Sequence, residues 1–310
     1  MIKVAICICT YRRPLMLKSC LDSIAKQDVP DAWDLSVILV DNDPQSELSN
    51  DLLKITASYP FHIRYHVESS RGIPFARNAA CELALDSGAD WIVFIDDDEV
   101  AEPGWLLAYD NARTKSKAKV LAGSVRYVSY DKSEEFVRID GKKLSGQPGF
   151  LESAATNNVM FSTEILRPPF SLRFDILMAL TGGSDTDFFL RYRQADGGIF
   201  GVPDSVVAEL VSEQRSTVRW KLGRLYRSNS NRSYINVKLY GKGYAAKSVL
   251  RIFWRTIPGL LVSPFYILFA FFWGGGSLVQ RALKPWVRCL GAVAGYVGFQ
   301  PKPYKTTDGE

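Results

Sequence analysis

Several residue types are scarce in this chain, and each scarcity excludes a class of protein. Five cysteines among 310 residues are an odd number, far below the density of a small secreted domain stapled by disulfides, so a reducing compartment fits better. We interpret the two histidines, His62 and His66, as structural residues rather than metal ligands. Internal repeats and low-complexity segments are also absent, which excludes repeat, collagen-like and coiled-coil architectures. The first apolar run, residues 4–9, is short and is followed rather than preceded by arginines, so we expect no signal peptide.

Charge is distributed unevenly along the chain. Residues 1–204 contain 22 basic and 29 acidic residues, whereas residues 205–310 contain 16 basic and four acidic ones. Residues 215–255 hold eleven Lys or Arg and no acid, interleaved with aromatic and aliphatic side chains. This asymmetry indicates that the C-terminal part of the chain meets an anionic partner, either a nucleic acid or a membrane surface.

A long uncharged segment follows the basic one. Residues 256–280 contain no charge in 25 positions, which is long enough for a membrane-spanning helix. Pro258, Pro264 and the three glycines from Gly274 interrupt it, so a broken, re-entrant or in-plane helix is an alternative to a clean span. Because this aromatic-rich block directly follows the basic segment, we predict membrane lipids as the anionic partner and no nucleic acid. A soluble helical subdomain with a large hydrophobic core stays open as an alternative.

The N-terminal part shows the pattern of an α/β domain. Apolar runs and amphipathic segments alternate, which predicts strands at residues 4–9, 35–40, 61–67 and 91–95 and helices at residues 15–27, 48–59 and 74–87. This alternation predicts a mostly parallel mixed sheet with flanking helices. The less regular part that follows predicts strands at residues 120–130 and 157–162, a polar loop at residues 131–150 and a helix at residues 184–194.

We expect three domains from these patterns. Residues 1–212 form the α/β domain, residues 213–255 a basic amphipathic helical segment, and residues 256–310 a hydrophobic, membrane-associated region. A second apolar stretch, residues 286–299, follows the first in this region, and basic residues flank both. By the positive-inside tendency, these flanks stay on the cytoplasmic side of the membrane.

Polar residues follow three of the predicted strands. They are Thr10-Tyr11-Arg12, Asp41-Asn42-Asp43 and the acidic run from Asp96 to Glu99. Parallel sheets bind ligands beyond the carboxyl ends of their strands, so we expect these residues to meet at one edge. Four consecutive acids repel each other unless a cation or hydrogen-bond donors compensate, and such oxygen ligands suit Mg²⁺ or Mn²⁺. A solvated acidic turn and a phosphoacceptor receiver domain are the alternatives.

Six segments carry a more specific pattern, in order along the chain. They are VAICICTYRRP, VILVDNDP, SSRGIPFARNAA, FIDDDEVAEPGWL, GGSDTDFFLRYRQADGGIF and VVAELVSEQRSTVRW. Together they resemble the inverting glycosyltransferases of family 2, in particular the bacterial subgroup with succinoglycan-type glucosyltransferases. The match covers roughly residues 2–227. The resemblance implies a GT-A fold, which is a Rossmann-like mixed sheet.

The resemblance also implies a nucleotide site and a metal site. The nucleotide site contains Thr10, Tyr11, Arg12, Asp41, Arg77 and Asp97, with Asp41 reading the base. For the metal, Asp98 is the expected direct ligand of Mn²⁺ or Mg²⁺, and Asp96 is expected beside it, at the water shell or the sugar. Glu209 stands where many relatives have a metal-proximal histidine, and we interpret it as a metal ligand, a residue supporting the ligands, or a structural acid.

The resemblance places the catalytic base at Asp185. The family usually has a glutamate at the preceding position, where this chain has Ser184. Asp187 is the back-up candidate near the acceptor. Arg215 and Arg219 are expected to meet either the donor diphosphate, as charge-assisted hydrogen-bond donors, or lipid headgroups.

These expectations describe a metal-dependent, inverting hexosyltransferase at the cytoplasmic face of the bacterial inner membrane. Its donor would be a nucleoside-diphosphate sugar, with UDP-glucose favoured by the resemblance, and its acceptor a polyprenyl-diphosphate-linked saccharide in exopolysaccharide or surface-glycan synthesis. A homo-oligomer stays open. A processive polysaccharide synthase is an alternative, although Gln214 and Arg219-Trp220 are spaced differently from its usual motif. A second alternative is a non-catalytic nucleotide-binding or membrane-adaptor protein.

Overall fold

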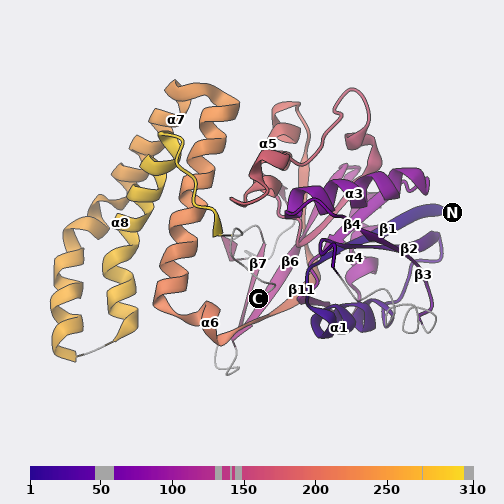
Figure 1. Cartoon of the computed structure of the whole chain (residues 1–310), viewed down its shortest axis with the longest axis horizontal. Helices are drawn as coiled ribbons and strands as arrows, with labels where there is room; N and C mark the ends of the chain where they lie inside the picture. Colours follow the sequence, from indigo (N-terminus) through magenta and orange to yellow (C-terminus); the bar gives the residue numbers. More distant parts are fainter. Residues whose placement is uncertain (46–58, 130–134, 140–141, 144–148, 274, 304–310) are drawn as a thin grey trace. The chain divides into compact units, whose positions relative to one another are not determined.

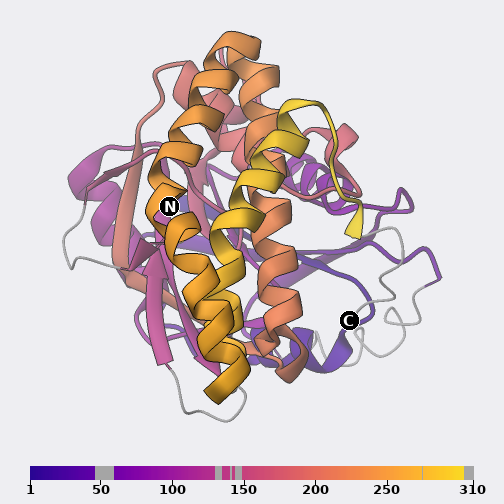
Figure 2. The same cartoon turned by 90° about the vertical axis from the view of Figure 1, so that its left-hand side faces the viewer.

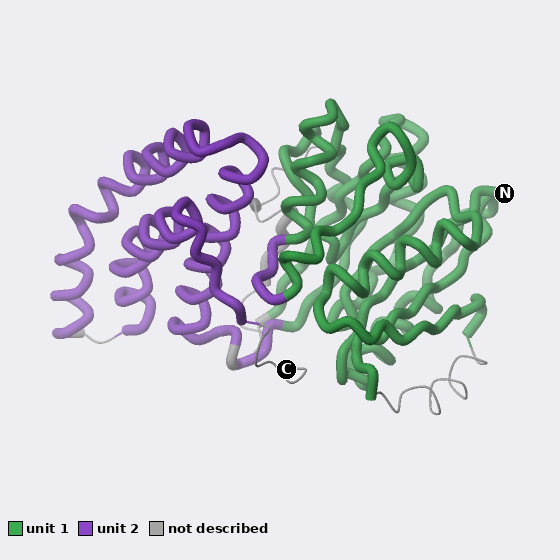
Figure 3. Tube along the Cα trace, turned by 45° about the horizontal axis from the view of Figure 1, so that its top comes forward, with its two compact units in different colours: residues 1–179, 184–210, 306–310 green, residues 180–183, 211–305 purple. Residues whose placement is uncertain are grey.

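The computed structural model describes residues 1–45, 59–129, 135–139, 142–143, 149–273 and 275–303. The chain divides into two compact units (Figure 3). Of the described residues, unit 1 contains 1–179 and 184–210, and unit 2 contains 180–183 and 211–303. The expected domain boundaries at residues 212 and 255 stay predictions.

Unit 1 is a mixed sheet with helices packed on its faces (Figure 1). Its strands are β1 (Ile2–Thr10), β2 (Trp33–Asp41), β3 (His62–Val67), β4 (Trp91–Ile95), β5 (Glu99–Ala101), β6 (Val120–Ser129), β7 (Glu135–Ile139), β8 (Lys142–Lys143), β9 (Phe150–Leu151), β10 (Asn158–Ser162) and β11 (Ile199–Val211). Its helices are α1 (Pro14–Ile24), α3 (Ile73–Asp86), α4 (Trp105–Ser116) and α5 (Ser184–Gln194), with 3-10 turns η1 (Thr163–Leu166) and η2 (Ile176–Met178).

The sheet has a parallel half and an antiparallel half. The strand order is β3-β2-β1-β4-β10-β6-β11-β5, and the first four strands are parallel neighbours. Strand β10 is antiparallel to β4 and β6, and β11 is antiparallel to β5, so the parallel pairings expected from the sequence are those of β1 to β4. In that half Thr10 pairs with Asp41 in register, which brings the ends of β1 and β2 to the same edge.

Two sequence expectations differ from the structure or fall outside it. The polar loop expected at residues 131–150 contains strands β7 and β8, because residues 135–138 pair with Val125–Val128 of β6 and extend the sheet. A pairing partner that lies far away in sequence cannot be recognised from local polarity. The helix expected at residues 48–59 lies outside the described residues, except for Tyr59.

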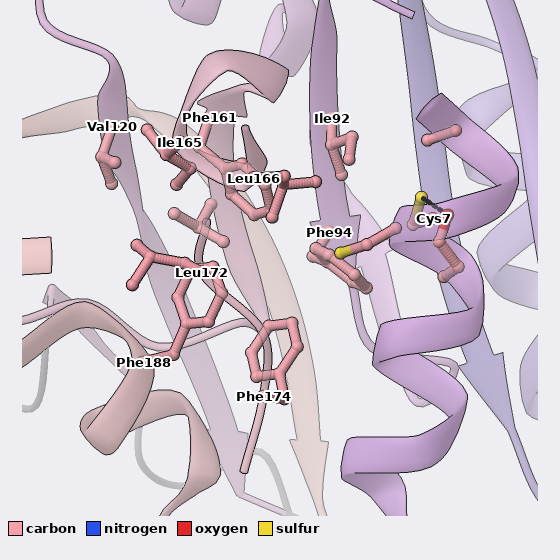
Figure 4. Packing of buried hydrophobic residues seen from close by; sticks show 14 of the residues in the cluster. Cys7, Ile92, Phe94, Val120, Phe161, Ile165, Leu166, Leu172, Phe174 and Phe188 are labelled. Atoms are coloured by element: carbon pink, nitrogen blue, oxygen red, sulfur yellow. Dashed lines mark hydrogen bonds between the residues drawn. The ribbon is translucent and has the colours of Figure 1, made fainter. Parts of the chain in front are cut away.

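The core lies on both faces of the sheet. Along β1, Val4, Ile6 and Ile8 point into one cluster, whereas Ala5 and Cys7 point into the other, as the period of a strand requires. Figure 4 shows the second cluster, in which Phe174 and Phe188 stack with their ring centroids 4.3 Å apart. This packing anchors α5, the helix whose first turn carries Asp185, to unit 1.

Unit 2 consists of helices α6 (Glu213–Ser216), α7 (Val218–Trp273) and α8 (Gly276–Tyr296). Helix α7 turns back on itself at Gly241, whose φ of +79° is unfavourable for other residues, and α8 runs beside its two halves (Figure 2). A Cβ on Gly291 would lie 2.5 Å from the Tyr226 carbonyl oxygen, and one on Gly295 would overlap the Ser230 carbonyl oxygen. The small residues of α8 therefore allow close packing on α7.

The apolar part of α7 is continuous and exposed. Helix α7 runs across the expected domain boundary between residues 255 and 256, and Pro258 and Pro264 lie inside it. In the described chain it is the one helix that is long and apolar enough to cross a membrane, and its most apolar stretch is only 11% buried. A soluble subdomain with a large hydrophobic core would bury these side chains. The exposure instead agrees with membrane association.

Candidate active site at the carboxyl edge of the sheet

The structure brings the predicted residues of three strand ends together. Thr10, the last residue of β1, donates from Oγ1 to Asp97 Oδ2 over 2.7 Å, although 87 positions separate them. Asp97 follows β4, which is the other parallel neighbour of β1. The expectation that the polar residues after these strands meet at one edge is thus correct.

Asp41 lies at this edge as a buried carboxylate. Its Oδ2 accepts a hydrogen bond from the Tyr65 hydroxyl over 3.2 Å, and its Oδ1 accepts one from the backbone N–H of Asp43 over 3.1 Å. Bonds to both oxygens hold the carboxylate in one orientation. Tyr65, from the neighbouring strand β3, was missed by the sequence analysis because an isolated tyrosine in a strand carries no functional pattern.

The turn after β1 is organised by an ion pair. Arg12 adopts a left-handed conformation (φ +54°), and its Nε lies 2.6 Å from Asp43 Oδ2. The hydrogen bond from Arg12 lowers the pKa of Asp43, which burial alone would raise. Tyr11 packs its ring against the same guanidinium, 5.1 Å from ring centroid to Cζ. The pair joins two of the predicted nucleotide-binding segments.

Arg13 compensates two acids of the acidic run. Its Nη1 lies 3.2 Å from Asp97 Oδ1 and 3.2 Å from Asp98 Oδ2. The sequence analysis did not identify Arg13, because its acidic partners lie more than 80 positions away. Adjacent carboxylates repel each other, and a fixed guanidinium is one group that offsets this repulsion. A bound cation is another.

Asp96 keeps 41% of its side chain exposed, more than Asp97 or Asp98. Burial raises the pKa of Asp96 to about 7; Arg77 opposes this shift, whereas the negative charges of Asp98, Asp97 and Glu209 add to it. Asp96 is the most exposed acid of this run.

Glu99 and Glu209 are neighbours on two adjacent strands of the sheet. They are directly paired in the antiparallel register of β5 and β11, and Glu99 is buried. Burial raises the pKa of Glu99 well above its ordinary value, and Asp96, Glu209 and Asp98 add to this shift. The Asn157 amide donates to Glu99 Oε1 over 2.9 Å. This places Glu209 beside the acidic run, but a role as metal ligand stays a prediction.

The donor set fits a divalent cation that is shared with a substrate. Within the described ranges, no three His, Cys, Asp or Glu side chains are grouped closely enough to hold a metal by themselves. Mg²⁺ and Mn²⁺ do not need such a cage, since one or two carboxylates suffice when substrate phosphates supply further oxygens. Asp98 and the exposed Asp96 are carboxylates of this kind, at the edge where a phosphate ligand is expected.

Arg77 connects the acidic run to the start of α5. It lies in the first turns of α3, with its Nη2 3.8 Å from Asp96 Oδ1, and its Nη1 donates to Ser184 Oγ over 3.4 Å. Asp185 is the next residue, and its Oδ1 accepts from the backbone N–H of Thr186 over 2.7 Å. Arg77 thus links Asp96, by an ion pair, to Ser184, the residue before the base candidate, by a hydrogen bond.

The other predicted residues are placed differently. Asp187 is completely buried and accepts from Arg191 Nε over 2.8 Å, so its carboxylate supports α5 and is closed to an acceptor. The back-up role as a base therefore gains no support. Arg215 lies in α6 and Arg219 at the start of α7, both in unit 2, and their roles toward the diphosphate or lipid stay predictions.

Comparison with known proteins agrees with this geometry. Residues 5–195 match the protein family described as Glycosyl transferase family 2. Over 225 residues the chain is 32% identical to the succinoglycan biosynthesis protein ExoM of Rhizobium meliloti (strain 1021), a match that covers 71% of either protein.

Solved structures share the fold at low identity. S. aureus TarS 1–349 in complex with UDP-GlcNAc has a TM-score of 0.55 at 14% identity, covering 77% of this chain and 72% of that one. GalNAc-T7 with UDP, GalNAc and Mn²⁺ has a TM-score of 0.56 at 12% identity; the match covers 75% of this chain but only 51% of the GalNAc-T7 chain. The family match and the identity to ExoM carry the assignment: this chain belongs to glycosyl transferase family 2 and is a glycosyltransferase with a GT-A fold.

Proposed function

We propose that this protein is a metal-dependent, inverting hexosyltransferase that uses a nucleoside-diphosphate sugar and a lipid-linked saccharide acceptor in bacterial exopolysaccharide or surface-glycan synthesis. The observation that carries the proposal is the chain of contacts from Thr10 through Asp97 and Arg13 to Asp98, continued by Arg77 from Asp96 to the residue before Asp185. The similarity to a succinoglycan biosynthesis protein supports the polysaccharide class of product.

The donor site lies along the ends of β1, β2 and β4. The fixed carboxylate of Asp41 is suited to accept hydrogen bonds from a nucleobase, and the bonded pair of Thr10 and Asp97 would contact the ribose. Fold neighbours with UDP and with UDP-GlcNAc support a uridine nucleotide as the donor carrier, with glucose as the proposed sugar.

Asp98 and Asp96 would hold Mn²⁺ or Mg²⁺ between the protein and the donor diphosphate. When bound, such an ion neutralises negative charge on the departing diphosphate as a Lewis acid. The Mn²⁺ in a fold neighbour supports a divalent cation. Arg13 fixes the orientation of Asp97 and Asp98, so these carboxylates do not have to reorganise during the reaction.

Asp185 is the proposed general base. Inversion requires an acceptor hydroxyl to attack the anomeric carbon from the face opposite to the diphosphate, and Asp185 would remove the proton from that hydroxyl. A positioned carboxylate contributes about 10²–10⁴-fold to such a step. Its Oδ1 is oriented by the Thr186 N–H, and the side chain is not fully buried, in contrast to Asp187.

Unit 2 would attach the enzyme to the cytoplasmic face of the membrane, where a polyprenyl-diphosphate-linked acceptor resides. Exposed apolar side chains cover the second half of α7, among them Leu261, Phe265, Leu268, Phe271 and Phe272. A patch of this kind on a polar protein marks an interaction surface. The lysines and arginines within residues 215–255 complement the negative charge of anionic lipid headgroups.

The packing of α8 on α7 favours helices that lie in the plane of the interface. Thr256 Oγ1 lies 3.1 Å from Cys289 Sγ, and Trp286 Nε1 donates to Ser263 Oγ over 3.0 Å. The basic residues of α8, Arg281, Lys284 and Arg288, therefore run alongside the apolar part of α7. A helix that crossed the bilayer would carry these charges inward, at about 2.5–3.5 kcal/mol for an arginine at the centre.

Two measurements test the proposal. Thermal denaturation of the full-length protein with UDP, GDP, ADP or CDP, each with and without Mn²⁺, would show stabilisation by one nucleotide, larger with the metal. Transfer from the matching radiolabelled nucleotide sugar to polyprenyl-diphosphate saccharides would then show a β-linked product from an α-linked donor. Absence of nucleotide binding under all these conditions would refute the proposal and favour a membrane adaptor.

A further inference from the structure

The loop before Asp185 has an unusual backbone. The connection between η2 and α5 ends with Thr181, Gly182 and Gly183. Both glycines have a left-handed backbone, with φ of +76° and +89°. Glycine has more conformational freedom than any other residue, so two in succession give this loop little stiffness of its own. Although the chain on both sides of it belongs to unit 1, residues 180–183 pack as part of unit 2.

One side chain of α7 holds this loop. The Nδ2 of Asn231 donates to the carbonyl oxygens of Thr181, over 2.9 Å, and Gly182, over 3.0 Å. Asn231 is only 8% exposed, and a Cβ on Gly183 would lie 3.2 Å from its Cβ. Both amide hydrogens of Asn231 are thus used on two successive carbonyls, directly before Ser184 and Asp185.

Asn231 is itself held by the segment that follows α8. Gln300 Nε2 donates to Asn231 Oδ1 over 3.2 Å, and the neighbouring Ser230 Oγ donates to the Phe299 carbonyl oxygen over 2.6 Å. The amide of Asn231 is therefore bonded at its oxygen and at its nitrogen. Such a bonded amide cannot rotate without breaking three hydrogen bonds.

We propose that Asn231 is a positioning residue for the catalytic base: it sets the conformation of the Thr181–Gly183 loop and thereby the place of Asp185. This inference rests on the base role of Asp185 in the proposed function. Asn231 need not touch either substrate. Its contribution is geometric, because a reacting group displaced by about 1 Å can cost 10²-fold in rate.

The isosteric change Asn231→Asp separates positioning from packing. It preserves volume and the oxygen that accepts from Gln300, but it replaces the donating NH₂ by an oxygen that repels the two carbonyls. We expect kcat to fall about 10–100-fold, with the donor KM and the nucleotide-dependent thermal shift unchanged. In Asn231→Ala we expect a smaller decrease in kcat, because this change removes the two hydrogen bonds without adding a repulsive oxygen.

The matched control is Asn236→Ala. Asn236 lies on the same helix, is also buried, and donates to Ser248 Oγ over 3.3 Å within unit 2. We expect this variant to lose stability without the selective loss of kcat. Should Asn231→Asp not fold, Gln300→Ala tests the same arrangement, because it releases the Asn231 oxygen from a less buried position, with a smaller decrease in kcat.

Hydrogen exchange of the loop gives a readout that does not depend on activity. In Asn231→Asp, peptides covering residues 180–187 should exchange faster than in the wild type, while peptides of β1 and β4 stay protected. Wild-type exchange together with wild-type kcat in this variant would overturn the inference. A wild-type protein without transfer activity would instead refute the proposed function, and the exchange data would still decide whether Asn231 holds the loop.

Discussion

Arg77 Nη1 donates a hydrogen bond to the hydroxyl of Ser184 over 3.4 Å, at the position where the family pattern usually has a glutamate. A glutamate there would supply a second negative charge to Arg77. With a neutral serine there, the guanidinium forms its ion pair with Asp96, 3.8 Å away. The departure from the pattern at Ser184 thus keeps a positive charge directed at the acidic run.

Replacing Arg77 should therefore impair the reaction. Charge-assisted hydrogen bonds contribute about 1.5–3 kcal/mol, so we expect Arg77→Ala to lower kcat/KM about 10–150-fold. Arg77→Lys should recover part of this loss, because it keeps the charge but not the planar group that reaches two partners. Steady-state kinetics with a saturating acceptor measure the effect, and an unchanged kcat/KM in Arg77→Ala would remove Arg77 from the site.

Asp98 and Asp185 should differ in which step they affect. We expect Asp98→Ala to abolish transfer and also to reduce the Mn²⁺-dependent stabilisation by nucleotide, since it removes a metal ligand. Asp185→Asn should lower transfer about 10²–10⁴-fold with that stabilisation intact. Thermal shift and transfer assays on both variants check this. Normal turnover in Asp98→Ala would contradict its role as a metal ligand, and normal turnover in Asp185→Asn would contradict its role as the base.

Asp187 should prove structural. Its buried carboxylate accepts a hydrogen bond from the Arg191 guanidinium, and a hydrogen bond between charged groups contributes about 1.5–3 kcal/mol. We expect Asp187→Asn to lower the midpoint of thermal unfolding, while the molecules that stay folded keep their turnover at low temperature. Denaturation curves and assays at about 10 °C would show this; a stable variant without activity would indicate a catalytic role instead.

The acidic run should make metal binding depend on pH. The pKa of Asp96 is raised to about 7 from an ordinary value of 3.8. Between pH 3.8 and pH 7, Asp96 therefore keeps its proton in the folded apo protein but has lost it in the unfolded chain. Stability from this group is present at low pH and declines as pH rises through that window. A cation needs the ionised carboxylate. Stabilisation by Mn²⁺ with nucleotide should therefore increase from about pH 5 to pH 8, and Asp96→Asn should flatten the profile.

The exposed face of α7 should bind anionic bilayers. We expect the pair of changes Leu261→Glu and Phe265→Glu to reduce flotation with phosphatidylglycerol vesicles at least about tenfold, because charged groups replace side chains that enter the acyl boundary. Leu15→Glu, at an exposed leucine of α1, is the control and should float like the wild type. Equal flotation of all three proteins would refute membrane attachment through α7.

Much of the candidate site could be predicted from the sequence before the fold was known. The acids at residues 41 and 96–98 each follow an apolar run that is long enough for a buried parallel strand, and parallel strands must end at the same edge. This is why their meeting could be predicted from spacing alone. Arg13 and Tyr65 were missed because their roles arise from partners that lie far away in sequence, and no local pattern records such a partner.

What the amino-acid order determined by itself is the alternation of strands and helices, the family pattern in six segments and the uncharged C-terminal block, since these depend on near neighbours in sequence. The tertiary structure decided which charges compensate each other: Arg13 with Asp97 and Asp98, Arg77 with Asp96, and Arg191 with Asp187. It also decided that Asn231 of a distant helix holds the loop before Asp185. The physical reason is range, because hydrogen bonds and ion pairs act over a few ångströms between residues that only folding brings within reach.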